Sequence, residues 1–254
     1  MNSSSSPREY NRFSVLQRVQ HWTMMASFTV LAVTGLPQKY PSAVWAEVMI
    51  GAMGGIELVR IVHRVAATVL MLVTVAHVGE LAYQVLVRRG QMTMLPSLQD
   101  LKNAVQAFGY NLGLARQAPQ QGRYTFEEKA EYWALLWGTL VMIFTGFMLW
   151  NPIATARFTP GQFIPAAKAA HGGEAVLAVL AVIVWHLYGV HIKRFNKSMF
   201  TGKMTEAEMA REHPLELADL KAGEAGRPLD PRILARRQRV FFPAYSVVAA
   251  GLLL

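Results

Sequence analysis

The sequence predicts an all-α integral membrane protein, a four-helix transmembrane bundle with a fifth C-terminal transmembrane helix that is incomplete in this sequence. Three observations predict this fold class. Hydrophobic residues make up 53% of the 254 positions and charged residues only 16%, which is typical of a membrane domain. Four apolar segments are about as long as the roughly 20 residues that a helix needs to cross a bilayer. Most of the seven histidines lie inside these segments, where an ionisable group indicates a functional site.

The composition also excludes several classes of protein. The chain has no cysteine, so it can form no disulfide and can ligate neither an iron–sulfur cluster nor a thiolate-bound haem. Its formal net charge is +9, but the basic residues cluster between the apolar segments and are not interleaved with stacking aromatic residues. Their expected partner is therefore the lipid surface, and we expect no nucleic-acid partner.

The first part of the chain, residues 1–18, is Ser-rich and then basic. We interpret it as a cytoplasmic N-terminal arm and not as a removed signal peptide, because Arg8, Arg12 and Arg18 precede a full-length span with no small-residue cleavage site. Residues 19–192 are the predicted four-helix membrane domain. Its membrane spans are expected at Val19–Leu36, Leu58–Val87, Glu131–Trp150 and Ala169–Ile192.

The remaining segments are expected to lie at the membrane surface or beyond it. The connection 88–130 is predicted to be cytoplasmic and to contain a surface-lying amphipathic helix at Leu95–Leu114. Segment 193–242 is charged and predicted to be cytoplasmic, with His213 on its surface. Residues 243–254 are interpreted as the start of a fifth membrane helix, since these 12 residues are fewer than the roughly 20 needed to cross.

The distribution of basic residues predicts the orientation. Twenty of the 25 Lys and Arg residues lie in the N-terminal arm, the 84–130 connection and the 192–243 segment. Because positive charge accumulates on the cytoplasmic side, the N-terminus is predicted to be cytoplasmic. His21 and His186 are then near the inner face of the membrane, and His63 and His171 near the outer face.

An internal repeat relates the two halves of the membrane domain. The first and third spans each carry a Trp followed 12 residues later by Thr-Gly, and the second and fourth spans each carry two histidines at similar spacing. The matching positions are His21-Trp22 with Tyr132-Trp133, Thr34-Gly35 with Thr145-Gly146, and His63 and His77 with His171 and His186.

The histidine spacing predicts two levels of sites. In an α-helix the 15 residues from His171 to His186 give about 22 Å of rise and an angular offset of about 60°. The 14 residues from His63 to His77 give about 21 Å and about 40°. Each helix therefore presents one imidazole near each membrane surface on one face. Facing helices of a bundle could then hold two b-type haems between paired histidines.

The residues alone leave the inner pairing open. Only His63 and His171 are available at the outer level, whereas His21, His77 and His186 compete at the inner level. For any single histidine the ordinary interpretation is a hydrogen bond between helices. Four histidines at two matched depths favour ligation, because an unsatisfied polar group inside a membrane costs several kcal/mol.

Several motifs resemble a known family. RVQHW with a following TG, VHRVA, GRYTFEEKAEYW leading into FTGFMLW, and WHLY resemble the cytochrome b gamma subunit of membrane-bound formate dehydrogenases, and the related cytochrome b subunits of nickel–iron hydrogenases and thiosulfate reductases. The resemblance covers roughly residues 12–205. It implies that His63 and His171 ligate the outer haem and that His21 and His186 ligate the inner one. It gives His77 no role, whereas the internal repeat would pair His77 with His186.

The same resemblance implies a quinone site beside the inner haem, in the stretch before the third span. The candidate residues here are Tyr124, Thr125, Glu128 and Lys129. Thr125 stands where the formate dehydrogenase pattern has an asparagine. An alternative interpretation is structural, because Thr125 and Glu128 have the spacing of a helix N-cap with a capping box.

Together these observations predict a membrane-embedded di-haem b-type cytochrome subunit of the bacterial inner membrane. It would carry electrons between the quinone pool of a respiratory chain and a peripheral redox partner on the periplasmic side. This partner would be an iron–sulfur or multihaem c-type protein. It would be an electron-transfer subunit that does not itself convert the terminal substrate. The competing hypothesis is a histidine-based transporter or proton channel, which predicts helices broken at mid-span by Gly or Pro. The four spans lack a mid-span proline.

Overall fold

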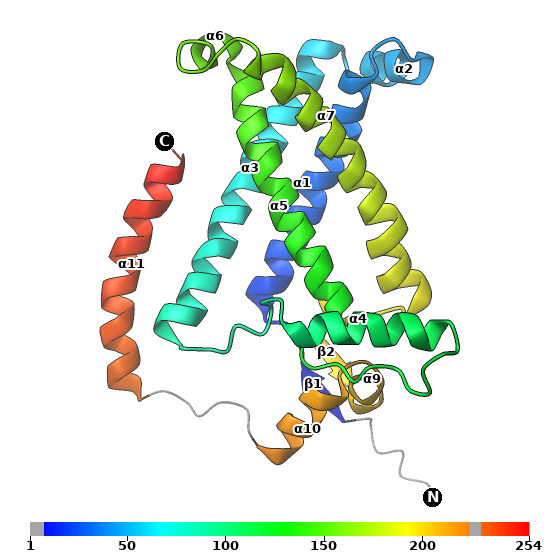
Figure 1. Ribbon diagram of the computed structural model, residues 1–254. Helices are drawn as coiled ribbons and strands as arrows, with labels where there is room; N and C mark the ends of the chain where they lie inside the picture. The colour runs from blue at the N-terminus through cyan, green and yellow to red at the C-terminus, as the bar shows by residue number, and fades with distance from the viewer. Residues whose placement is uncertain (1–7, 224–229, 254) are drawn as a thin grey trace, which may run out of the picture. The chain divides into compact units, whose positions relative to one another are not determined.

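The computed structural model describes residues 8–223 and 230–253, which are mostly helical (Figure 1). In chain order the elements are β1 (Glu9–Asn11), α1 (Val15–Lys39), α2 (Val44–Ala52), α3 (Ile56–Ala82), η1 (Tyr83–Val87), α4 (Leu98–Asn111), α5 (Phe126–Trp150), α6 (Pro152–Thr155), α7 (Phe163–Ala181), η2 (Val182–Lys193), α8 (Ser198–Thr201), β2 (Lys203–Thr205), α9 (Glu206–Glu212), α10 (Pro214–Ala222) and α11 (Pro231–Leu253).

The residues group into two compact units. Unit 1 consists of Met1–Arg18, Val75–Tyr132 and Lys197–Leu254, and unit 2 consists of Val19–Thr74 and Trp133–Asn196. Helices α1, α3 and α5 contribute residues to both units. All four histidines that the resemblance implies as ligands belong to unit 2.

In unit 2 the helices α1, α3, α5 and α7 run in alternating directions, and the short helices α2 and α6 lie at the same end (Figure 1). Each half of the unit thus has a long helix, a short helix and a second long helix. This is the arrangement expected for an internal repeat of helix pairs in an antiparallel bundle.

Within residues 8–223 and 230–253, three helical segments are long and apolar enough to cross a membrane. They are Ile56–Val87, Phe126–Trp150 and Phe163–Lys193. Large apolar side chains on them are exposed, as Phe144 and Val184 are at 67% each. Apolar side chains that are exposed to this extent are expected to contact lipid. The chain is an integral membrane helical bundle. Helix α1 is less apolar because it contains Gln20 and His21.

The fourth predicted span is not α-helical throughout. The structure has π-helix at η2, Val182–Lys193, and a shorter one at η1, Tyr83–Val87. A π-helix has i→i+5 hydrogen bonds and a wider turn, so the offset of about 60° expected between His171 and His186 from α-helical geometry is wrong. The sequence carries no mark of this change, since Val, Ile, Leu and Trp suit either helix. Such π segments occur frequently at functional sites.

Unit 1 contains the one β pairing among the described residues, which the all-α prediction missed. Strand β1 pairs antiparallel with β2, with Tyr10 opposite Met204. A small apolar core of Met204, Met209 and Leu217 lies behind the pair. Strands of three residues are too short to show a period of two, and these two come from opposite ends of the chain.

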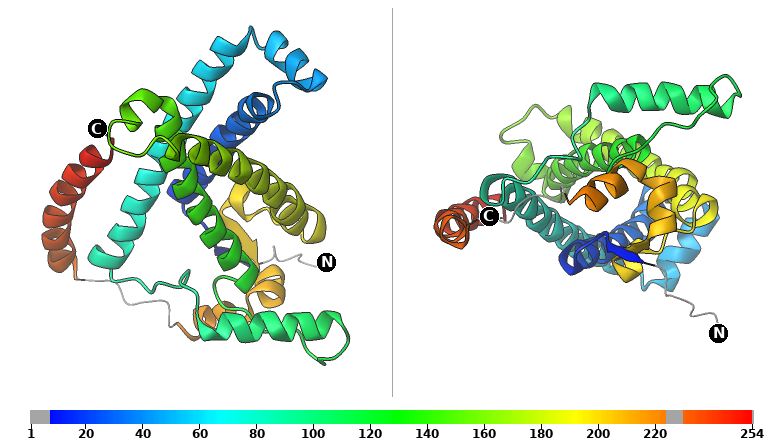
Figure 2. Two further views of the ribbon diagram at one scale, coloured as in Figure 1. Left: turned by 45° about the horizontal axis from the view of Figure 1, so that its top comes forward. Right: turned by 90° about the horizontal axis from the view of Figure 1, so that it is seen from below.

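Helix α11 begins at Pro231, twelve residues before the segment 243–254 that we interpreted as the start of a fifth membrane helix. Asp230 caps it, accepting a hydrogen bond of 2.8 Å from the Arg232 amide, and proline suits the first turn. Helix α11 lies against η1 and the end of α3 (Figure 2). Tyr245 donates a hydrogen bond of 2.7 Å to the Val75 carbonyl.

Gly79 is the residue on α3 that admits the Tyr245 side chain. A Cβ built at this position collides with the Tyr245 phenol. We expect Gly79→Ala to destabilise the docking of α11 by about 1–3 kcal/mol, the usual cost of overpacking. Hydrogen exchange of α11 amides should be faster in this variant. Gly251→Ala is the matched control, because nothing lies within 4 Å of a Cβ there; equal exchange rates in both variants would contradict the prediction.

Candidate functional site

Two pairs of histidines face each other in unit 2. His63 of α3 and His171 of α7, here named the outer pair, have ring centroids 6.5 Å apart. His21 of α1 and His186 of η2, the inner pair, have ring centroids 6.3 Å apart. The names follow the membrane sides that the basic residues predict. All four side chains are half-buried.

These separations suit a metal held between the rings. Two imidazoles on opposite sides of one metal, each at a metal–nitrogen distance of about 2 Å, have ring centroids roughly 6 Å apart. Both pairs therefore fit bis-histidine ligation of a haem iron, which is the ligation that the resemblance implies.

The outer pair is also oriented by threonines. The Oγ1 of Thr34 lies 2.9 Å from Nδ1 of His63, and the Oγ1 of Thr145 lies 2.9 Å from Nδ1 of His171. The inner pair differs, because Nδ1 of His21 is buried and has no hydrogen-bond partner within residues 8–223 and 230–253. The sequence contains these threonines in its repeat, but the repeat alone does not show that they reach an imidazole.

Glycines adjoin the same two rings. A Cβ at Gly35 would lie 3.1 Å from Cε1 of His63, and one at Gly146 would lie 3.4 Å from Cε1 of His171. The first distance is tighter than an ordinary contact and the second is at its limit. The Thr-Gly dipeptide of each repeat therefore orients a ring and leaves space for it.

His77 has a different neighbour in unit 1. Its Nε2 lies 3.1 Å from the Tyr132 hydroxyl, with ring centroids 5.8 Å apart. In the internal repeat His77 corresponds to His186, and Tyr132 corresponds to His21. The His77–Tyr132 contact is thus the repeat equivalent of the inner pair, with tyrosine in place of one histidine. The structure brings His186 together with His21.

The four candidate quinone residues lie at the N-terminus of α5, where they have structural partners. Thr125 is its N-cap: the Glu128 amide donates to Thr125 Oγ1 (3.1 Å), and the Thr125 amide donates to Glu128 (2.8 Å). This confirms the capping-box interpretation. Lys129 pairs with Asp100 of α4 at 2.9 Å, and the Tyr124 ring lies 5.2 Å from the Arg12 guanidinium.

The residues just before α5 are held by contacts that the sequence did not predict. Glu216 of α10 accepts hydrogen bonds of 2.5 Å from both Arg12 and Arg123. His213 was expected on the surface but is buried, and its Nδ1 donates to the Gly122 carbonyl at 2.8 Å. His213 can be buried because the hydrogen bond to the Gly122 carbonyl offsets the cost of removing its ring from water.

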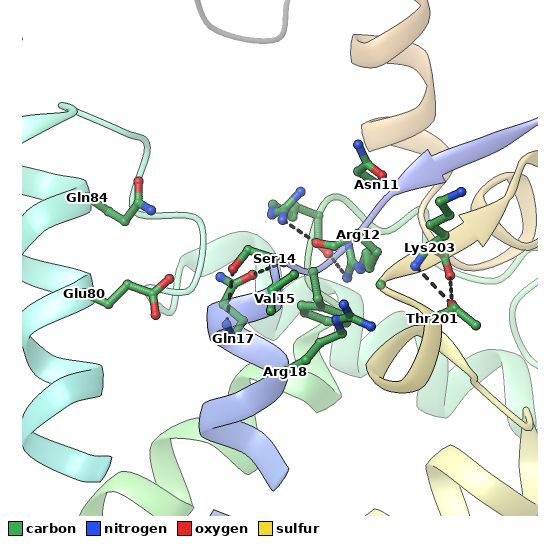
Figure 3. A pocket seen from close by; sticks show the side chains of 13 residues that line it. Asn11, Arg12, Ser14, Val15, Gln17, Arg18, Glu80, Gln84, Thr201 and Lys203 are labelled. Atoms are coloured by element: carbon green, nitrogen blue, oxygen red, sulfur yellow. Dashed lines mark hydrogen bonds between the residues drawn. The ribbon is translucent and has the colours of Figure 1, made fainter. Parts of the chain in front are cut away.

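A polar pocket of about 530 Å³ lies beside this cluster in unit 1 (Figure 3). Arg12 and Arg18 line it from the start of the chain, Lys203 from β2, and Glu80 and Gln84 from α3 and η1. A second pocket of about 610 Å³ includes Tyr124 and Lys129 among its lining residues. Candidate quinone residues therefore border open space, although their polar groups are engaged.

Known proteins match this chain over most of its length. The family model for prokaryotic cytochrome b561 matches residues 12–202. The formate dehydrogenase cytochrome b556(fdo) subunit of Escherichia coli K12 is 25% identical over 207 residues, which are 80% of this chain and 89% of that protein. The nitrate-inducible cytochrome b556(Fdn) subunit of the same strain is 20% identical over 220 residues, 84% and 93% of the two chains. The formate dehydrogenase cytochrome b556 subunit of Haemophilus influenzae is 20% identical over 201 residues, 78% and 77%.

The Asp100–Lys129 pair should make the start of α5 sensitive to acid. Burial raises the pKa of Asp100, but hydrogen bonds from Lys129 and Ser97 outweigh it and lower the pKa below its ordinary value. The pair therefore stabilises the fold above the ordinary carboxyl pKa of about 4, and this contribution is lost as the pH falls through the lowered pKa.

We expect the hydrogen-exchange protection of the first turns of α5, measured against the intrinsic rate at each pH, to fall below about pH 4 in the native chain. In Asp100→Asn the free energy of local opening should already be lower at pH 7, by the roughly 0.2–1 kcal/mol of one ion pair. Exchange should therefore be faster at pH 7 and should respond less to acid. An identical acid response in both proteins would show that Asp100 is not the group responsible.

Proposed function

Because the chain belongs to the prokaryotic cytochrome b561 family, we propose that it is a di-haem b-type cytochrome subunit carrying electrons between a peripheral redox partner and the quinone pool. As a family member it is a bacterial membrane cytochrome b that acts in electron transfer. The observation that carries the finer proposal is the presence of two histidine pairs in unit 2, with centroids 6.3 and 6.5 Å apart.

Each pair would hold one haem b. His63 and His171 are the proposed axial ligands of the outer haem, and His21 and His186 those of the inner haem. The iron supplies one-electron chemistry when the haem is bound. The chain supplies the ligands, their orientation and an apolar surrounding, which are the properties that set a haem potential.

The inner assignment favours His21 over His77. The ring of His186 lies 6.3 Å from that of His21, a separation that suits a shared metal. His77 instead has the Tyr132 hydroxyl within 3.1 Å. A tyrosine hydroxyl that shares a hydrogen bond with His77 Nε2 occupies the nitrogen that would otherwise face a metal.

The relatives suggest what the partner is. Their names identify them as cytochrome b subunits of formate dehydrogenase. We propose that this chain likewise joins a peripheral catalytic assembly, with an iron–sulfur or multihaem c-type protein as its direct electron partner on the periplasmic side. The excess of basic residues in the N-terminal arm and the long connections supports an inner-membrane location with a cytoplasmic N-terminus.

The quinone is proposed to react near Tyr124, Thr125, Glu128 and Lys129. Quinone reduction consumes protons as well as electrons, and ionisable groups at the N-terminus of α5 can supply them whereas an apolar helix interior cannot. Tyr124 and Lys129 border a pocket of about 610 Å³, so a ligand could approach them. The capping box and the Asp100 ion pair would then hold these groups in place.

We expect two b haems per chain in pyridine haemochrome analysis of the purified protein, and low-spin EPR signals from both in the native chain. His63→Ala and His171→Ala should each abolish the same haem and leave the other, because these are the two ligands of one proposed site. His21→Ala should abolish the inner haem, whereas His77→Ala should leave both haems in place. Absence of haem b from the native chain would overturn the proposal, and loss of a haem in His77→Ala with two retained in His21→Ala would reverse the inner assignment.

For the quinone site we expect the double variant Glu128→Gln, Lys129→Gln to slow quinone turnover while both haem spectra stay unchanged. Neither side chain is a proposed ligand, so a change confined to turnover reports on the quinone reaction. Lys102→Gln is the control and should leave turnover unchanged, since Lys102 of α4 is exposed and does not line the pocket. Unchanged turnover in a folded and fully haem-loaded double variant would leave these residues a structural role alone.

A further inference from the structure

The two outer histidines meet identical groups on neighbouring helices. Thr34 of α1 contacts His63 of α3, and Thr145 of α5 contacts His171 of α7, each with an Oγ1–Nδ1 distance of 2.9 Å. Thr34 is buried, with 3% of its surface exposed. The same contact therefore forms twice, once in each half of the internal repeat.

The threonine protons decide which nitrogen of each ring carries hydrogen. Thr34 Oγ1 lies 2.7 Å from the Val30 carbonyl oxygen, and Thr145 Oγ1 lies 2.6 Å from that of Val141. A carbonyl oxygen can only accept, so each hydroxyl gives its single proton to its own helix. The hydroxyl oxygen must then accept from the imidazole, which places the ring hydrogen on Nδ1 and leaves Nε2 with a free lone pair.

The neighbouring glycines limit how far these rings can shift. The Cε1 atoms of His63 and His171 would lie 3.1 and 3.4 Å from Cβ atoms added at Gly35 and Gly146. Each ring thus lies against helix backbone on one side and a threonine hydroxyl on another. A ring that rotated away from the hydroxyl would lose this hydrogen bond.

We propose that Thr34 and Thr145 are positioning residues that fix the Nδ1–H tautomer of the outer ligands and lower the reduction potential of the outer haem. This inference rests on the proposed haem ligation. An imidazole that donates its second N–H becomes a more basic ligand. A more basic ligand favours the more positively charged ferric iron, and hydrogen bonds to the ligands are one of the ways in which a protein sets a haem potential.

The inner pair lacks the corresponding support at one ligand. Nδ1 of His21 is buried without a hydrogen-bond partner in the part of the chain that the structure describes. The threonine contacts therefore distinguish the two levels. Taken alone, this difference biases electron transfer from the outer site toward the inner one, because it lowers the potential of the outer site.

The test uses Thr34→Val and Thr145→Val, singly and together, in the haem-loaded chain. Valine keeps the shape of threonine and removes the acceptor. Redox titration followed by absorption and low-temperature EPR should show both haems, with the outer one shifted upward. Each hydrogen bond is expected to contribute roughly a fivefold change in the ratio of oxidised to reduced iron, or about 40 mV at 59 mV per tenfold. The outer signal is the one that His63→Ala lacks.

Two further variants separate this role from simple packing. Thr34→Ser and Thr145→Ser keep the hydroxyl and should restore the native potential and EPR signal. Thr29→Val is the control on α1, since Thr29 makes the same hydrogen bond to its own helix, 2.8 Å to the Met25 carbonyl, but is exposed. It should leave both haem potentials unchanged.

The outcomes distinguish this inference from the proposed function. Loss of the outer haem in the valine variants, with native behaviour in the serine variants, also supports the inference. Native potential and EPR signal in the double valine variant, with two haems bound, would overturn it and leave the di-haem function intact. Loss of the outer haem in both serine variants would overturn it as well, and a native chain without haem b would instead overturn the proposed function.

Discussion

An imidazole inside a membrane helix has two nitrogens that each need a partner, and much of unit 2 follows from this requirement. Lipid offers no hydrogen bond, and an unsatisfied polar group there costs several kcal/mol. For the outer pair, threonines on neighbouring helices satisfy Nδ1. The opposite ring lies 6.5 Å away, so the remaining nitrogens can share a metal. The requirement thus couples α1 to α3 and α5 to α7.

The internal repeat holds at the outer level and is broken at the inner level. His63 and His171 are repeat equivalents and have equivalent threonine contacts. The inner pair joins His21 from the first half to His186 from the second. Their repeat equivalents, Tyr132 and His77, contact each other in unit 1. Substitution of tyrosine for one histidine accounts for the difference, because a phenol can hydrogen-bond an imidazole in place of a metal.

Residues 121–123, which precede α5 in unit 1, are held by hydrogen bonds to their backbone carbonyls. The carbonyls of Gln121, Gly122 and Arg123 accept hydrogen bonds from the Leu215 amide, the His213 imidazole and the Arg12 guanidinium in turn. These donors come from the N-terminal arm and from α10 and its N-cap. A loop whose carbonyls are engaged one after another has few alternative conformations. This is a suitable support for residues proposed to meet a quinone.

The sequence by itself determined the membrane class, the helices and their repeat, because hydropathy, period and histidine spacing are local properties of the chain. It also identified the capping box at Thr125, whose two partners are three residues apart. The tertiary structure alone decided the β1–β2 pairing, the burial of His213 and the contact of His77 with Tyr132. Each of these depends on which distant segments meet. The contact of Thr34 and Thr145 with the outer histidines is of the same kind, since a helix pattern shows which residues share a face but not what the neighbouring helix presents to it.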